Sequence, residues 1–183
     1  GLNGLLQIGD SLETIRWNSF QGINNFTGQL QLGKNVKQID NSAFEDFSNF
    51  IGALIIPNSV TFIGNYAFSG CSRFNGTLKL PNGIVKINKN TFSNCSQFKG
   101  TLNIPNLVSE IDEFAFSGCS GFTGKLIIPN SVTSIGNNAF SNCIGFTGSL
   151  NISNNITSIG NFAFSYCSNL RSITIPTSVT SIG

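Results

Sequence analysis

The chain has 183 residues, of which 40% are hydrophobic and only 10% are charged, so it can bury one sizeable core and does not have the composition of a disordered segment. Its formal net charge of +2 is too small to steer nucleic acid or an anionic membrane surface toward the protein, and we expect no nucleic-acid partner. No run approaches the roughly 18 consecutive apolar residues of a membrane span, so we also expect no direct membrane insertion.

Apolar residues recur every 24 positions along almost the whole chain. We call each set of residues with this spacing a column. Four columns are aliphatic and run, in steps of 24, from Leu6 to Leu150, from Ile8 to Ile152, from Leu12 to Ile156 and from Ile15 to Ile159. Two columns are aromatic: Phe20, Phe44, Phe68, Phe92, Phe116, Phe140, Phe164, and Phe26, Phe50, Phe74, Phe98, Phe122, Phe146 with Leu170. A strict period of this length predicts a repeat protein in which each copy forms one turn.

In chain order, the first predicted element of each copy is a short strand. In the clearest copy, residues 125–128 alternate so that Leu126 and Ile128 share one face, which is typical of a strand. Pro129 ends this strand, because proline cannot donate to a ladder of backbone hydrogen bonds. Residues 132–135 are predicted to form a second short extended piece.

A tight corner is predicted after the second extended piece. One column there holds only residue types that tolerate a left-handed backbone: Asp40, Gly64, Asn88, Asp112, Gly136 and Gly160. The Ala-Phe-Ser-x-Cys stretch that follows, residues 139–143 in the same copy, is short and compatible with a single helical turn.

One copy cannot bury its apolar side alone, whereas stacked copies turn each column into a continuous ladder inside a coil. The predicted fold is therefore a solenoid of leucine-rich-type repeats with about seven 24-residue turns. It has parallel β-strands, one per turn plus the second short extended segment, and little helix. We expect residues 1–183 to form a single domain, a segment of a longer array, because neither end carries the polar cover of a terminal repeat.

The charged residues provide an independent test of this stacking. Charges in the same column of adjacent turns form five pairs, all opposite in sign: Asp10/Lys34, Glu13/Lys37, Arg16/Asp40, Lys86/Glu110 and Lys89/Glu113. Each exposed pair would contribute only about 0.2–1 kcal/mol to stability. Their agreement in sign predicts that residue i lies over residue i+24.

The Ile-Pro-x-Ser-Val-Thr-Ser-Ile-Gly and Ala-Phe-Ser-x-Cys segments resemble the BspA-like leucine-rich repeats, also called the Treponema type. Residues 55–71, 103–119 and 127–143 carry the resemblance most closely. The first two turns depart from it, with Gly9 and Gly33 in place of proline. The resemblance implies a surface protein of bacteria or some protists that acts as an adhesin, so the expected location is extracellular or at the cell surface.

Five cysteines occupy one column: Cys71, Cys95, Cys119, Cys143 and Cys167. Their number is odd, no Cys-x-x-Cys occurs, and earlier turns have Ile23 and Phe47 in the same position. An apolar residue can replace a buried thiol but cannot replace a metal ligand. We therefore predict a ladder of buried free thiols, with no disulfide and no metal.

No residue constellation indicates an enzyme. The chain has no histidine, which excludes Ser–His and Cys–His nucleophiles and histidine metal sites. Close carboxylates occur only as Glu45 with Asp46 and as Asp112 with Glu113, and consecutive acids at a corner are usually solvated. We expect no catalytic residues and no cofactor.

A partner is expected on the outward columns of the stacked strands, where each turn contributes to one flat surface. These columns supply ten candidate partner-binding residues: Gln29, Gln31, Ile55, Thr77, Lys79, Thr101, Asn103, Lys125, Ile127 and Asn151. Their amides and hydroxyls suit many weak polar contacts better than a deep pocket, although plain sheet surface would have the same composition.

Aromatic residues outside the core columns form a second candidate surface, or else pack under loops: Trp17, Phe62, Tyr66, Phe114 and Phe162. The basic run Arg73, Lys79, Lys86, Lys89 and Lys99 is interpreted as solvated surface rather than a nucleic-acid site, because its columns point to different sides of the coil.

Two functional hypotheses follow from the sequence. In the first, the chain is a non-catalytic interaction or adhesion module that binds a protein or glycan, on a host or neighbouring cell surface, through its stacked-strand face. In the alternative, it is a structural subunit that self-associates end to end through uncapped ends into a filament or surface coat.

Overall fold

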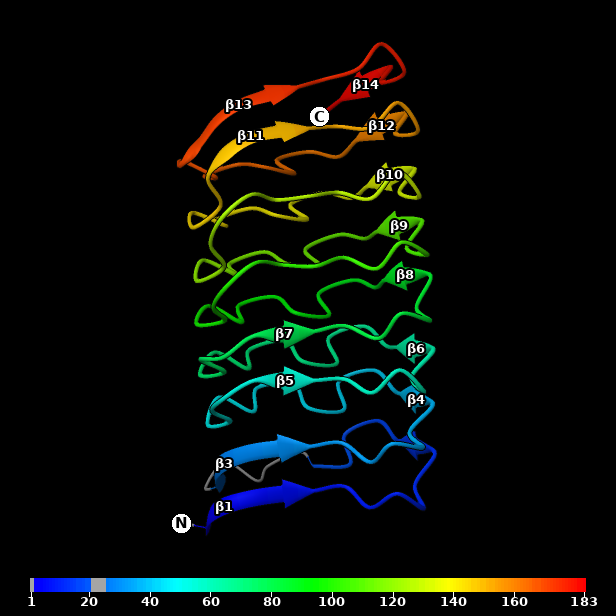
Figure 1. Ribbon diagram of the computed structural model, residues 1–183, viewed down its shortest axis with the longest axis vertical. Helices are drawn as coiled ribbons and strands as arrows, with labels where there is room; N and C mark the ends of the chain where they lie inside the picture. Colours follow the sequence, from blue (N-terminus) through cyan, green and yellow to red (C-terminus); the bar gives the residue numbers. More distant parts are fainter. Residues whose placement is uncertain (1, 21–25) are drawn as a thin grey trace.

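The computed structural model describes residues 2–20 and 26–183, and this part of the chain is a solenoid of about seven turns without a helix. The turns lie one above the next from the N-terminal to the C-terminal end (Figure 1). All strand pairs are parallel. The predicted class of fold is therefore confirmed.

Two stacks of short strands run along the solenoid. The first stack contains β1 (Leu2–Gln7), β3 (Phe26–Gln31), β5 (Leu54–Ile55), β7 (Leu78–Lys79), β11 (Gly148–Asn151) and β13 (Leu170–Thr174). Between β7 and β11 it continues as an isolated parallel bridge from Asn103 to Ile127. These strands correspond to the first predicted strand of each copy.

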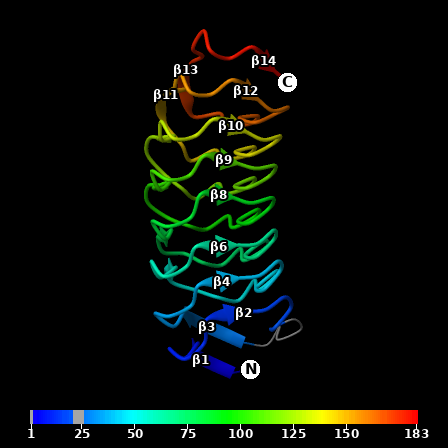
Figure 2. The ribbon, with the colours of Figure 1, turned by 90° about the vertical axis from the view of Figure 1, so that its right-hand side faces the viewer.

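The second stack corresponds to the second extended piece and is seen face-on in Figure 2. It contains β2 (Thr14–Ile15), β4 (Gln38–Ile39), β6 (Phe62–Ile63), β8 (Lys86–Ile87), β9 (Glu110–Ile111), β10 (Ser134–Ile135), β12 (Ser158–Ile159) and β14 (Ser181–Ile182). In both stacks adjacent turns pair residues 24 apart, such as Leu54 with Leu78. The last turn pairs residues 23 apart, such as Ser158 with Ser181, because the final copy is one residue shorter.

The core is the interior of the coil, and phenylalanine rings stack through it. Phe68, Phe92, Phe116 and Phe140 are fully buried, and the centroids of adjacent rings in this ladder are 5.5–5.7 Å apart. The second phenylalanine column stacks in the same way, with 5.6 Å between Phe74 and Phe98. Burying one large aromatic per turn in each ladder supplies much of the hydrophobic driving force.

One predicted core position is wrong. Leu12 was expected inside with the rest of its column, but its side chain is 47% exposed. Val36 and Val60, which follow it in the column, are fully buried. Leu12 belongs to the first turn that the structure describes, where its position in the period did not suffice to bury it.

The predicted left-handed corner is also misplaced. Gly64, Gly136 and Gly160 do not adopt positive φ, whereas residues two positions later do, for example Asn90 at 54° and Asn138 at 54°. The glycines serve another purpose, because a Cβ at Gly136 would lie 2.6 Å from the backbone nitrogen of Glu113 in the preceding turn. The glycines therefore allow close approach between turns, whereas Asp40, Asn88 and Asp112 show that other turns of this column accept a side chain.

The Ala-Phe-Ser-x-Cys stretch forms successive tight turns and not the helical turn that was expected. In residues 139–143 the backbone of Ser141 donates to the carbonyl of Asn138, and that of Cys143 donates to Phe140. Asn138 and Asn142 both have left-handed φ, at 54° and 61°. A helix cannot contain left-handed residues, so the chain turns repeatedly here.

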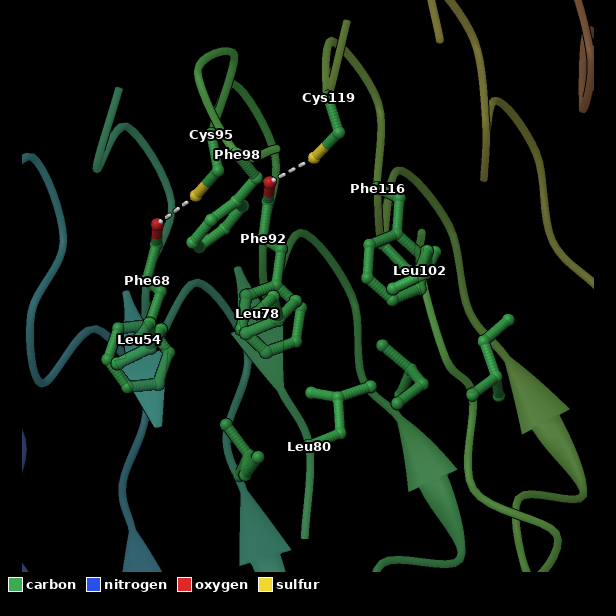
Figure 3. Close-up of a cluster of buried hydrophobic side chains, with 14 of the residues drawn as sticks. Leu54, Phe68, Leu78, Leu80, Phe92, Cys95, Phe98, Leu102, Phe116 and Cys119 are labelled. Atoms are coloured by element: carbon green, nitrogen blue, oxygen red, sulfur yellow. Dashed lines mark hydrogen bonds between the residues drawn. The ribbon is translucent and has the colours of Figure 1, made fainter. Parts of the chain in front are cut away.

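The cysteine column is a ladder of buried free thiols, as predicted. Each thiol bonds the carbonyl of the phenylalanine 27 residues earlier: Cys119 Sγ lies 3.0 Å from the Phe92 oxygen, and Cys95 Sγ lies 3.0 Å from that of Phe68 (Figure 3). Phe47, in the same column, is also buried, so this position of the repeat accepts an apolar side chain. Ile23, the other substitute, lies outside the described residues.

These thiols are expected to be unreactive in the folded protein. Burial raises the pKa of the Cys95 and Cys119 thiols well above the usual range, and it raises that of Cys167 to about 11. Only the thiolate is nucleophilic, so iodoacetamide at mildly alkaline pH should leave the native protein unmodified and label all five cysteines in guanidinium chloride. Mass spectrometry of both samples measures this, and rapid labelling of the native protein would contradict the buried ladder.

Candidate binding face

The outward residues of the first strand stack form a continuous surface. We define the strand face as the outward residues of β1, β3, β5, β7, β11 and β13 and the equivalent residues of the turns between them. Along β3 the burial alternates: Phe26 and Leu30 are buried, whereas Gln29 and Gln31 are exposed. This alternation follows from the two-residue period of a strand and places one set of side chains in the core and the other in solvent.

All ten predicted partner-binding residues are exposed on the strand face, and each of them lines one of three hollows along the solenoid. The largest hollow, about 650 Å³, is lined by Thr77, Lys79, Thr101 and Asn103 from two successive turns. Asn82, Pro105 and Asn106 also line it. These three were not among the predicted residues, although a Pro-Asn step recurs at 57–58, 81–82, 105–106 and 129–130.

The other two hollows contain the exposed isoleucines. Ile55, which is 56% exposed, lines a hollow of about 460 Å³ with Gln29 and Gln31. Ile127, which is 69% exposed, lines one of about 310 Å³ with Lys125, Asn151 and Ser149. Each hollow thus combines amide or hydroxyl groups with an aliphatic or cationic side chain, which suits contact with a partner rather than chemical catalysis.

Ion pairs also link adjacent turns, and one of their lysines, Lys34, lines the hollow around Ile55. Four of the five predicted pairs form, and the nitrogen–oxygen distances are 3.4 Å for Lys34–Asp10, 2.7 Å for Lys37–Glu13, 2.9 Å for Lys86–Glu110 and 2.7 Å for Lys89–Glu113. The fifth, Arg16 with Asp40, forms no ion pair in the described structure.

The best-connected charge is Lys86, which also contacts Asp112 at 2.9 Å. Partial burial tends to raise the pKa of Asp112, but hydrogen bonds from the Glu113 backbone and the Lys86 ammonium outweigh it and lower the pKa. The stabilisation from a lowered carboxyl pKa is present above the unfolded-state pKa and is lost as the pH falls through the folded-state pKa. This cluster thus contributes to the stability of the folded chain at neutral pH.

The five aromatic candidates differ in exposure and do not form a common second surface. Trp17 and Phe162 are each 67% exposed and Phe62 is 44% exposed, whereas Tyr66 and Phe114 are only partly exposed. Tyr66, Phe114 and Phe162 share a left-handed backbone, with φ between 55° and 59°. They lie at the corner after the second strand stack and not on the strand face.

Within residues 2–20 and 26–183, no group of three or more cysteine or acidic side chains is placed to hold a metal ion. In the same residues, no helix is long and apolar enough to cross a membrane.

Comparison with known proteins connects this geometry to a family. The family model described as "BspA type Leucine rich repeat region" matches six copies over residues 5–123 and 86–183. Among solved structures, a leucine-rich repeat protein from Bacteroides ovatus is 27% identical, with a TM-score of 0.84 over 100% of this chain and 48% of that one. A leucine-rich repeat protein of T. pallidum is 28% identical, with a TM-score of 0.67 over 81% of this chain and 67% of that one.

A third structure, a leucine-rich repeat protein from Eubacterium ventriosum, shares the fold at 19% identity, with a TM-score of 0.74 over 97% of this chain and 45% of that one. The chain thus spans about half the length of the Bacteroides and Eubacterium proteins. No curated protein sequence matches the chain significantly.

Proposed function

Because the chain belongs to the BspA-type leucine-rich repeat family, we propose that it is a non-catalytic interaction module, located at the cell surface or outside the cell, that binds a protein or glycan through its strand face. One observation carries the proposal: ten outward residues from successive turns line three consecutive hollows. Stacked repeats commonly use such an extended surface for binding, because every turn adds one set of contacts without changing the core.

The proposal is tested with matched surface substitutions. The full chain is screened against immobilised glycans and purified extracellular-matrix proteins, and each binder is then measured with Ile127→Glu and Val85→Glu. Both parent side chains are exposed, 69% and 58%, but only Ile127 is on the strand face. We expect Ile127→Glu to weaken binding more than tenfold and Val85→Glu to leave it within twofold. The proposal fails if nothing binds, or if the two variants behave alike.

The alternative, which we propose as a second candidate, is stacking of copies end to end. The last turn exposes Ile173, Ile175 and Ile182 by 41%, 40% and 62%, around a hollow of about 230 Å³. These side chains would be covered either by a further turn of the same protein or by the first turn of a second copy. The molecular mass in solution, measured over a hundredfold dilution, distinguishes these two possibilities. A mass that increases with concentration supports stacking, and a constant monomer mass excludes it.

A further inference from the structure

The charges of this protein are segregated between its sides. Acidic residues are absent from the outward positions of the strand face in the described part of the chain. They lie mainly near the second strand stack and its corner, where Glu13, Glu110, Asp112 and Glu113 pair with lysines. The ion pairs beside the second strand stack therefore offset part of the acidic charge there.

The strand face, in contrast, carries lysines without acidic partners. Lys79, Lys99 and Lys125 occupy outward strand positions and are exposed, and none of them forms an ion pair with any described residue. Lys79 and Lys125 each line a hollow that contains no acidic side chain. A surface whose outward positions carry unpaired lysines and no anion is electrostatically complementary to a negatively charged partner.

The spacing of these cations restricts what the partner can be. Lys79 and Lys125 come from turns two apart, so about 10 Å of the solenoid axis separates their strands, because neighbouring strands lie about 4.8 Å apart. A nucleic-acid strand has one phosphate roughly every 3.4 Å and would find too few cations here. A linear polysaccharide with a carboxylate on every second sugar carries its charges at a spacing close to that of the two lysines.

The neutral groups around the lysines favour a sugar over an acidic peptide. The hollow around Lys79 is lined by the hydroxyls of Thr77 and Thr101 and the amides of Asn82 and Asn103. These groups both donate and accept hydrogen bonds, as sugar hydroxyls do. Protein interfaces rely on large aromatic or arginine anchors, and this hollow is lined by none.

We propose that the strand face binds a linear acidic polysaccharide with one carboxylate on every second sugar, a proposal that rests on the proposed function. Lys79 and Lys125 contact successive carboxylates along the axis, and Lys99 contacts the polymer from the edge of the face. The threonine hydroxyls and asparagine amides between them bind the sugar hydroxyls.

The test uses hyaluronan oligosaccharides as the probe and the full chain as the protein. Lys79→Gln and Lys125→Gln each remove one strand-face charge, and Lys37→Gln removes one from the paired side as a matched control. We expect about a fivefold loss of affinity from each strand-face variant, the size of one solvent-exposed charge contact. The double variant should lose more than either single variant, and Lys37→Gln should stay within twofold. Equal thermal midpoints show that the variants fold.

Three further probes separate the outcomes. Hyaluronan with its carboxylates reduced to alcohols should bind at least tenfold more weakly than the native polymer, and raised salt should weaken the native polymer. Equal binding of the reduced polymer, stronger binding of poly-glutamate, or equal losses from Lys37→Gln and Lys79→Gln would each overturn this inference. Suppose that Ile127→Glu abolishes the binding of another partner and that hyaluronan does not bind to any variant. The proposed function then stands, and the inference fails.

Discussion

Replacing Phe92 with alanine is expected to destabilise the protein by about 3–5 kcal/mol, the usual cost of removing a fully buried aromatic side chain. Phe92 is completely buried and stacks between Phe68 at 5.7 Å and Phe116 at 5.5 Å. The substitution leaves a cavity in the middle of the ladder and weakens the contact between turns on both sides. Because each turn contacts only its neighbours, we expect the guanidinium unfolding transition to broaden as well as to shift.

Phe62→Ala is the matched control, since it removes the same side chain from a position that is 44% exposed. We expect it to cost less than about 1 kcal/mol, as surface substitutions usually do. Guanidinium unfolding followed by circular dichroism measures both variants. A loss below about 1 kcal/mol for Phe92→Ala would show that the phenylalanine ladder is not the core.

Replacing Gly76 with alanine is expected to cost about 2–3 kcal/mol, because the added methyl group forces two turns apart. A Cβ at Gly76 would lie 2.6 Å from the backbone nitrogen of Ala53 and 2.7 Å from the carbonyl carbon of Gly52 in the preceding turn. Neither atom belongs to a flexible side chain that could move away, so the backbone itself must shift.

Gly83→Ala controls for the loss of glycine itself. The nearest atom to a Cβ at Gly83 is the Thr61 Cγ2 at 3.5 Å, an ordinary contact, and its φ is not in the left-handed region. We expect this variant to be neutral or stabilised by about 0.4–1 kcal/mol, because alanine reduces the entropy of the unfolded chain. Thermal unfolding compares the two, and equal midpoints for Gly76→Ala and Gly83→Ala would contradict the close approach between turns.

The period of the sequence determined most of the fold. Residues in one column meet in adjacent turns, so the columns that contain Phe92 and Cys119 could be assigned to the core before any coordinates were known. The charge pair Lys89 with Glu113 predicted the register for the same reason. The strand alternation also predicted that Gln31 and Asn103 point outward, because a two-residue period leaves the side chain only two directions.

Only the tertiary structure decided how closely the turns approach and which charges gain a further partner or none. The need for glycine at Gly136 depends on a distance to Glu113 in the preceding turn, and residue type alone suggested a left-handed corner instead. The column of Lys86 predicted its pairing with Glu110, but its second ion pair, with Asp112, became evident only in the structure. The period determines which residues are neighbours. Packing in three dimensions sets the backbone separation and the reach of the side chains, and these decide whether neighbours need glycine or form an ion pair.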